Sequence, residues 1–240
     1  MEYFYLQEVS FEKGEAVITG QEARHIAKVL RHKPGDEIFG TNGRGDEFRM
    51  VIKGIKPDRV LVQVLERRNG QREPRHMLTL APAVLKGDKL SFVVEAVTEL
   101  GVSEIVPFFS SRVIGRMGER KLQRLRTVAI SGMKTALRTF LPEVRPAVEF
   151  ESLVRRFKDF DRVLVAYEEE HATSLTAVLD SKVKSLLLVI GPEGGFTEEE
   201  VTGMREAGAA LFTLGPRRLR AETAAVAATA LCLGLLGDLK

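Results

Sequence analysis

The sequence predicts an α/β protein with two domains, a small strand-rich domain followed by a larger one built on a mainly parallel sheet. Before about residue 66, short segments of alternating polarity are separated by turns, a pattern typical of a compact β-domain. After about residue 76, apolar runs alternate with stretches of helical periodicity, which is typical of a parallel sheet covered on both faces. The polar stretch Arg67–Arg75 separates the two patterns, so we expect domains at residues 1–70 and 75–240.

The first domain is expected to form a barrel-like sheet with one helix. In the helix, Gln21–His32, the apolar residues Ala23, Ile26 and Leu30 recur at the spacing of one helical face. Turn-forming residues such as Asn42-Gly43 separate the later strands. The expected strands are Tyr3–Val9, Ala16–Ile18, Asp36–Thr41, Glu47–Ile55 and Arg59–Leu65.

The second domain is expected to alternate strands and helices. Its clearest helix, Lys86–Leu100, carries an apolar stripe and is followed by Gly101, a favoured residue just after a helix. A long basic helix is expected over Glu119–Arg138, and it must stop before Pro142. The expected strands are Met77–Ala81, Glu104–Phe109, Arg162–Tyr167, Leu186–Ile190 and Ala210–Leu214.

Two loops rich in glycine and proline follow the last two of these strands, one over Gly191–Gly195 and one at Gly215-Pro216. Thr197 and Glu200 then form a capping-box pattern, which predicts the start of a helix. Ligand crevices form outside the carboxyl ends of parallel strands, so we expect the two loops to lie side by side and hold a ligand. Ordinary strand-to-helix turns are the alternative, and neither loop has a phosphate-binding pattern.

Composition indicates an ordinary soluble globular protein, with 44% hydrophobic and 29% charged residues. The single cysteine, Cys232, has no partner for a disulfide, which fits a reducing cytosol. The N-terminal residues lack the basic and apolar regions of a secretory signal. The longest apolar stretch, Ala224–Gly237, is shorter than the roughly 20 residues of a membrane span. We therefore expect a cytoplasmic protein without a membrane partner.

Charge is distributed unevenly along the chain. The net charge of +3 is only mildly basic, but basic residues dominate Arg112–Arg145. Such a run is typical either of a solvated helix face or of a surface that contacts nucleic-acid phosphates, and we favour the second. The candidate nucleic-acid contacts are Arg24, Arg31, Arg112, Arg116, Arg120, Arg124, Lys134 and Arg138.

Several motifs resemble those of one known family. GPEGGFTEEE and LGPRRLRAETA at the two loops are similar to segments of the RsmE family, SPOUT-class methyltransferases that use S-adenosylmethionine to methylate N3 of a uracil in 16S ribosomal RNA. HIAKVLRHKPGDEI and ELGV extend the resemblance over essentially the whole chain. The resemblance implies a trefoil knot near the C-terminus, a PUA-like RNA-binding barrel at the N-terminus, and a homodimer that acts on 16S ribosomal RNA or the assembled small subunit.

The resemblance also implies roles for residues near the two loops. Cations beside the uracil would stabilise the anion that develops as N3 loses its proton, and the candidates are Arg220 and Arg138, with Lys134 third. The proton acceptor is left open between Glu222, a phosphate and water. Glu193 is expected either to attract the donor's positive charge or simply to favour a helix start. The expected donor-binding residues are Ile190, Gly191, Glu193, Gly194, Leu214, Gly215, Leu219 and Arg220.

The chain departs from the family pattern at a few positions. Ala96 stands where lysine is frequent, and Thr135, Ala136 and Leu137 stand where Gln, Ser and Gly are usual. These departures weaken the inference of amide hydrogen bonds to the substrate. Two other functions therefore stay open, ribose 2′-O methylation of RNA and RNA binding without catalysis. No metal is expected, because the histidines are scattered and there is no second cysteine.

Overall fold

The computed structural model describes residues 2–6, 11–12 and 14–239. The chain divides into two compact units, Met1–Glu73 with Met133–Leu141, and Pro74–Gly132 with Pro142–Lys240. The division after Glu73 falls in the polar stretch that separates the two sequence patterns. The segment Met133–Leu141 belongs to the first unit, although its sequence position suggests the second. The reason is that the Glu73 carboxylate accepts hydrogen bonds from the backbone N–H groups of Thr139 and Phe140.

The first unit is built on a six-stranded sheet. Its strands are β1 Tyr3–Tyr5, β2 Phe11–Glu12, β3 Glu15–Thr19, β4 Glu37–Thr41, β5 Asp46–Lys56 and β6 Arg59–Asn69. They lie in the order β1-β4-β5-β6-β3-β2, and only β1 and β4 pair in parallel. The pairing of β5 with β6 shifts register after Arg49 and after Ile52, and such bulges bend a strand. Positions 7–9 of the expected first strand lie outside the described residues.

The expected helix Gln21–His32 is observed as two shorter elements, α1 Gly20–Arg24 and the π-helix η1 His25–Val29. Ala23 and Ile26 are fully buried in the core of the first unit, as their spacing predicts. The helical stretch ends early because the backbone of Arg31 lies in the left-handed region, with φ of 56°.

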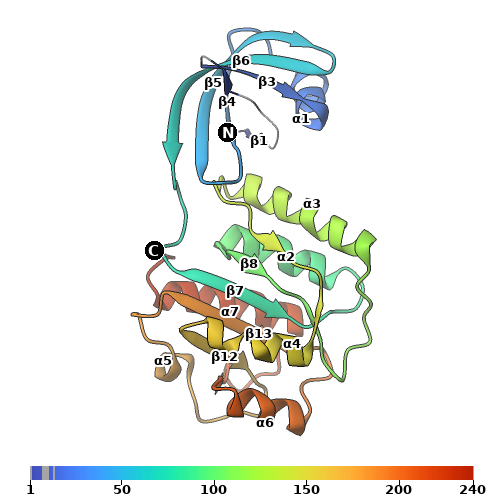
Figure 1. Ribbon diagram of the computed structural model, residues 1–240, viewed down its shortest axis with the longest axis vertical. Coiled ribbons are helices and arrows are strands. Elements are labelled where there is room, and N and C mark those ends of the chain that lie inside the picture. The colour runs from blue at the N-terminus through green and yellow to red at the C-terminus, as the bar shows by residue number, and fades with distance from the viewer. Residues whose placement is uncertain (1, 7–10, 13, 240) are drawn as a thin grey trace. The chain divides into compact units, whose positions relative to one another are not determined.

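The second unit is built on a six-stranded parallel sheet (Figure 1). Its strands are β7 Met77–Pro82, β8 Glu104–Ile105, β10 Glu143–Val144, β12 Arg162–Ala166, β13 Ser185–Ile190 and β14 Ala210–Phe212. The order is β10-β8-β7-β13-β12-β14, and every neighbouring pair is parallel. All carboxyl ends therefore lie at one edge. β13 and β14 are not adjacent, because β12 lies between them, so the loops that follow these two strands flank the carboxyl end of β12.

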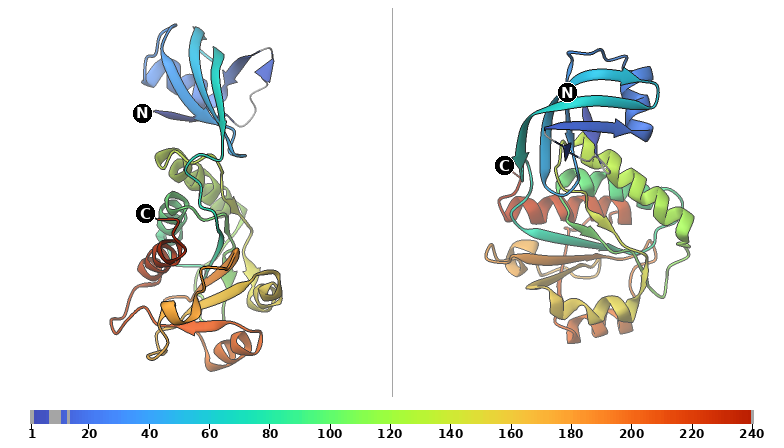
Figure 2. Two further views of the ribbon diagram at one scale, coloured as in Figure 1. Left: turned by 90° about the vertical axis from the view of Figure 1, so that its left-hand side faces the viewer. Right: turned by 45° about the horizontal axis from the view of Figure 1, so that its top comes forward.

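Helices cover both faces of this sheet (Figure 2). On one face lie α2 Lys89–Leu100 and α7 Ala221–Leu235, which contact each other. On the other face lie α4 Phe150–Arg155 and α6 Glu198–Glu206. Leu153 of α4 and Met204 of α6 form a buried core with Leu187 and Val189 of β13. Alternate residues of each strand thus pack against helices on opposite faces of the sheet. Helices on both faces therefore support the edge of the sheet from which the loops extend.

Two expected elements are shorter than the sequence suggests. The strand Glu104–Phe109 is interrupted at Pro107, and β9 Phe108–Phe109 pairs instead with β11 Val148–Glu149 in a separate two-stranded sheet. The basic helix α3, Glu119–Thr135, ends before Arg138 because Leu137 has a left-handed φ of 55°. Short elements in residues 143–159 and 175–178 escape prediction because none is long enough to show a period. In the described part of the chain, no helix has the length and apolar character of a membrane span.

Candidate functional site

Two neighbouring cavities open in the second unit, at the carboxyl edge of the parallel sheet. The larger, of about 450 Å³, is lined mainly by the segments after β12 and β14. The smaller, of about 390 Å³, is lined by the loop after β13 and the start of α7. Both volumes suit a small organic ligand. We call them together the paired cavity, because they share Ala166, Glu168, Arg218, Leu219 and Ala224.

In the loop after β13, Gly191 lies too close to the ring of Phe196 to carry a side chain. A Cβ there would lie 2.9 Å from Cε2 of Phe196. That ring is buried and stacks on Phe108 at a centroid distance of 6.4 Å. Gly195 has a φ of 71°, and a Cβ at this position would collide with the carboxylate of Glu168. The two glycines therefore let backbone, rather than side chains, form this wall of the paired cavity.

The predicted capping box begins the helix that follows this loop. The Thr197 hydroxyl accepts a hydrogen bond from the Glu200 N–H at 3.2 Å, and the Glu200 carboxylate accepts one from the Thr197 N–H at 2.9 Å. The prediction is confirmed. The other oxygen of Glu200 accepts a bond from the Ser111 N–H at 2.8 Å, which ties a distant segment to the same helix start.

That segment places Arg112 at the paired cavity. Its guanidinium donates to the carbonyl of Gly194 at 2.9 Å, and both residues line the larger cavity. The expected RNA contact of Arg112 stays a prediction. In this structure the side chain is part of the cavity wall and not part of the basic helix surface.

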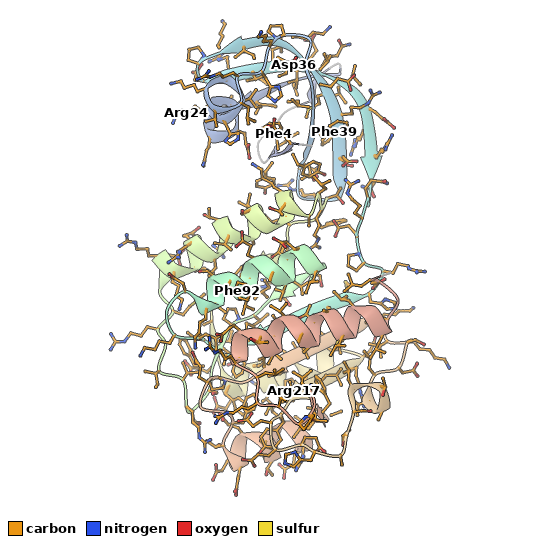
Figure 3. All side chains as sticks on the ribbon, turned by 180° about the vertical axis from the view of Figure 1, so that it is seen from behind. Phe4, Arg24, Asp36, Phe39, Phe92 and Arg217 are labelled. Atoms are coloured by element: carbon orange, nitrogen blue, oxygen red, sulfur yellow. The ribbon has the colours of Figure 1, made fainter. Side chains whose placement is uncertain are left out.

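The loop after β14 supplies the opposite wall. Gly215 has a φ of 98°, and its N–H donates to the Thr213 hydroxyl at 3.1 Å, so the turn closes on itself. Leu214, Gly215 and Leu219, all expected to bind the donor, line the larger cavity. Arg217 lies on the same loop (Figure 3).

The end of β12 contributes a set of residues that the sequence did not assign to the site. Because β12 lies between β13 and β14, the residues at its carboxyl end stand between the two loops. The set comprises Ala166, Tyr167, Glu168, Glu169 and His171. The acidic run Glu168–Glu170 directly after an expected strand was the available signal. Glu168 is the acidic residue shared by both cavities.

Lys89, at the start of α2, lines the smaller cavity and pairs with two carboxylates there. It was not among the site residues expected from the sequence. Its Nζ lies 2.9 Å from Glu193 and 3.8 Å from Glu222. Burial alone would raise the pKa of Glu193, but the hydrogen bond from Lys89, backbone N–H groups and the charge of Lys89 together hold the pKa below its ordinary value. Glu222 lines neither cavity, and its buried Oε2 has no hydrogen-bond partner in the described part of the chain.

Arg220 is exposed on the wall of the smaller cavity, together with the expected Ile190, Gly191 and Glu193. The alternative for this residue is a salt bridge to Glu193 or Glu222. Over residues 2–6, 11–12 and 14–239, no carboxylate lies within ion-pair distance of its guanidinium. Glu193 and Glu222 both pair with Lys89 instead, and Arg220 lines the cavity.

Arg138 and Lys134 lie in the first unit, each beside a carboxylate. Nη2 of Arg138 is 2.8 Å from Glu73, and the arginine is only 3% exposed. Nζ of Lys134 is 2.7 Å from Glu22 and 5.8 Å from the centre of the Phe4 ring. The expected roles of Arg138 in catalysis and RNA contact stay predictions. In this structure the Arg138 side chain is buried beside Glu73.

The remaining candidate RNA contacts are exposed. Arg24 on α1 (Figure 3) and Arg31 lie on the surface of the first unit. Arg116, Arg120 and Arg124 line one open cavity of the second unit. Among the described residues, no three His, Cys, Asp or Glu side chains come together as a metal-binding set.

Comparison with known families defines the class of protein. Residues 71–233 match the model of the RNA methyltransferase domain, and residues 18–65 match that of the RNA methyltransferase PUA domain. The chain is an enzyme of the RNA methyltransferase class with a PUA-like N-terminal domain. The expected fold class, a PUA-like N-terminal domain followed in the sequence by an α/β domain with a parallel sheet, is confirmed. The trefoil knot stays a prediction.

Individual relatives specify the family. The Ribosomal RNA small subunit methyltransferase E of Bacillus subtilis is 35% identical over 217 residues, which cover 86% of this chain and 85% of the relative. The protein of the same name from Mesomycoplasma hyopneumoniae is 29% identical over 220 residues, 90% of this chain and 93% of the relative. The chain belongs to the Ribosomal RNA small subunit methyltransferase E family, as the resemblance of its motifs implied.

Solved structures agree with this assignment. A Ribosomal RNA small subunit methyltransferase E from Neisseria gonorrhoeae, bound to S-adenosyl methionine, superposes with a TM-score of 0.91 at 29% identity and full coverage of both chains, 100% and 100%. A probable rRNA-methyltransferase from Porphyromonas gingivalis has a TM-score of 0.88 at 29% identity, also over 100% of each chain.

Proposed function

We propose that this protein transfers a methyl group from S-adenosylmethionine to N3 of a uracil in 16S ribosomal RNA of the small subunit. The observation that carries the proposal is the paired cavity, a ligand-sized space at the carboxyl edge of a parallel sheet with Arg220 exposed on its wall. Family membership and the relative bound to S-adenosyl methionine support the donor. The resemblance of the two loop motifs supports the N3 position.

The paired cavity has the residues that an adenosyl ligand requires. Ile190, Leu214 and Leu219 offer aliphatic surface for a purine, and the glycine-rich loops expose backbone groups for hydrogen bonds. Glu168, which lines both parts of the paired cavity, carries negative charge that favours a cationic ligand, whereas the carboxylate of Glu193 is already paired with Lys89. When bound, S-adenosylmethionine supplies an electrophilic methyl group on a positively charged sulfur.

Arg220 is the residue that we propose acts on the uracil. N3 carries a proton, so negative charge develops on the ring as that proton leaves, and a fixed cation stabilises this charge. Arg220 suits the task because it immediately precedes α7 in an extended conformation, with φ of −68° and ψ of 151°. An arginine stays protonated and is no base. Glu222 as the proton acceptor stays a prediction, since its carboxylate lies outside the cavity walls.

The proposed partners are 16S ribosomal RNA, free or in the assembled small subunit, and a second copy of the chain. The small residues Ala225 and Ala228 of α7 are fully buried within the chain. An exposed apolar surface remains beside them, because Leu231 and Leu235 of α7 are 50% and 44% exposed. Phe92 on the adjoining α2 is 56% exposed (Figure 3). We propose that the homodimer forms through this surface.

A labelling experiment tests the function. The protein is incubated with labelled S-adenosylmethionine and either protein-free 16S ribosomal RNA or small ribosomal subunits, and the modified nucleotide is located by digestion and mass spectrometry. A methyl group on uracil N3 supports the proposal. A linkage that resists alkaline cleavage would assign ribose 2′-O methylation instead. Absence of label, together with absence of thermal stabilisation by the donor, would indicate RNA binding without catalysis.

Substitution of Arg220 by alanine tests the proposed role of this residue. We expect kcat to fall by about 10²–10³-fold, the range seen when one donor to a developing anion is removed. Donor affinity from titration calorimetry should change by less than about threefold, because the interaction is made mainly in the transition state. Arg155→Ala, an exposed arginine bonded to Ser152, is the matched control. An equal loss of donor affinity would instead assign Arg220 to donor binding.

A further inference from the structure

A third cavity opens in the second unit between the starts of α2 and α3, with a volume of about 710 Å³. We call it the basic cavity, because five cations line it against one carboxylate, that of Asp88. The cations are Lys86, Arg116, Arg120, Lys121 and Arg124.

Carboxylates of the described residues do not neutralise the positive charge of the basic cavity. Nη1 of Arg124 lies 2.8 Å from Asp88, but the two side chains are 58% and 78% exposed, and such surface pairs contribute little. Over the described residues, the other four cations have no carboxylate within ion-pair distance. Five cations and one carboxylate leave a net charge of +4 around one opening. An anionic ligand would supply the missing charge.

The backbone at the mouth of the basic cavity is also accessible to a ligand. A Cβ at Gly87 or Gly118 would meet no atom within 4 Å, so these glycines border open space. They directly precede the first turns of α2 and α3, where free N–H groups and the helix dipole favour anions. Gly115 has the opposite environment. A Cβ there would lie 2.9 Å from the carbonyl oxygen of Val84, so the wall segment packs firmly on the end of β7.

Two side chains show how an anion with an attached nucleoside would fit. Nζ of Lys121 donates to the Leu85 carbonyl at 3.2 Å, and burial, aided by Arg124, lowers the pKa of this lysine. A phosphate beside Lys121 would offset that cost of burial. Ile114, on the same wall, is 85% exposed. Its side chain offers an apolar surface next to the cations. A base or sugar attached to a bound phosphate could pack against this surface.

The basic cavity adjoins the paired cavity through one loop. The Lys86 N–H donates to Glu193 at 3.4 Å, and Lys89 Nζ donates to the same carboxylate at 2.9 Å. Lys86 lines the basic cavity, whereas Lys89 and Glu193 line the smaller part of the paired cavity. Residues 85–89 therefore form a thin partition between the two.

We infer that the basic cavity binds a phosphodiester of the RNA strand that carries the methylated nucleotide, with Ile114 against a neighbouring base or sugar. A phosphate held there lies next to the paired cavity, so it sets which nucleotide reaches the donor. The inference rests on the proposed function, since it presumes that the substrate is RNA.

Salt-dependent binding tests the inference. The variant Arg116→Gln, Arg120→Gln, Arg124→Gln is compared with the control Arg155→Gln, Lys158→Gln, Lys182→Gln, which removes the same charge at exposed positions elsewhere in the second unit. The probe is a fluorescein-labelled fragment of 16S ribosomal RNA that contains the methylated nucleotide, titrated at several potassium chloride concentrations. Each lost phosphate contact lowers the slope of log K against log salt by about 0.7–0.9, so loss of the one phosphodiester held in the basic cavity should lower the slope of the cavity variant by that amount. Equal slopes in the cavity and control variants would overturn the inference.

Crosslinking tests the position of the bound strand. Ile114→Cys is labelled with a photo-crosslinker in the full chain, and the native Cys232 is buried and escapes labelling. Crosslinks clustered within a few nucleotides of the methylated one support the inference, and crosslinks no closer than those of labelled Lys158→Cys overturn it.

Donor binding separates the two hypotheses, because thermal stabilisation by S-adenosylmethionine should be the same in the wild type and the cavity variant. A wild type that binds no RNA would overturn the proposed function together with this inference. A wild type that methylates RNA, beside a cavity variant that matches the control, overturns the inference alone.

Discussion

Replacing Gly191 by alanine tests how closely the loop after β13 must pack on the ring of Phe196. The added Cβ would lie 2.9 Å from Cε2 of Phe196 and 3.2 Å from both Cδ2 and Cζ of that ring. The ring has no free space to move into, because it is buried and stacks on Phe108 with an interplanar angle of 10°. The backbone of Gly191 is not left-handed, so the substitution tests steric fit alone.

The expected effect follows from the cost of overpacking a filled core, which is about 1–3 kcal/mol. For a domain of this size, each kcal/mol lowers the melting temperature by about 2–4 °C. A displaced ring would also shift the wall formed by Gly191 and Glu193. We therefore expect the Kd for S-adenosylmethionine to rise about tenfold, which corresponds to about 1.4 kcal/mol.

Scanning calorimetry and titration calorimetry measure the two effects. The control is Gly203→Ala in α6, where a Cβ would meet no atom within 4 Å. In a helix interior this change should stabilise the protein by about 0.5–1 kcal/mol. A lower melting temperature for Gly191→Ala and a higher one for Gly203→Ala, each relative to the wild type, would support the reasoning. If Gly191→Ala melts at the wild-type temperature and binds the donor equally well, the close packing of the loop on Phe196 is refuted.

Two further substitutions test ion pairs that hold segments together. Asp238→Asn should cost about 1–3 kcal/mol at pH 7, because the buried carboxylate accepts hydrogen bonds from the His76 N–H and Nδ1. Burial alone would raise the pKa of Asp238, but these bonds hold it below 3.8, so its stabilisation is present above pH 3.8 and disappears as pH falls through the folded-state pKa. A constant difference from the wild type between neutral and strongly acidic pH in urea unfolding would contradict this. Glu73→Gln should destabilise the first unit by about 3–5 kcal/mol, because it removes the charge of Glu73 from its buried ion pair with Arg138. The control Glu66→Gln removes the charge of an exposed ion pair with Arg68 and should change the free energy of unfolding by less than about 1 kcal/mol. Similar losses of stability in the two variants would show that the pair of Glu73 and Arg138 does not stabilise the fold.

Local signals in the sequence were sufficient for most of the secondary structure. The apolar run that becomes β13 and the capping box of Thr197 and Glu200 each depend on residues within one turn or one strand of each other. The same holds for the two glycine loops, whose residues line the paired cavity as expected. Where the pattern misled, a single backbone feature decided the outcome. Pro107 interrupted an expected strand, and the left-handed Leu137 ended α3 early.

By itself, the sequence determined the alternation of strands and helices and the two glycine loops, because these follow from short-range periodicity and backbone preference. Only the tertiary structure decided that β12 lies between β13 and β14 and brings Glu168 into the site. It also decided that Lys89 pairs with Glu193, 104 positions away in the sequence, and that Glu73 pairs with Arg138, 65 positions away. Such contacts depend on strand order and on packing between distant segments, and no periodicity within one segment encodes them.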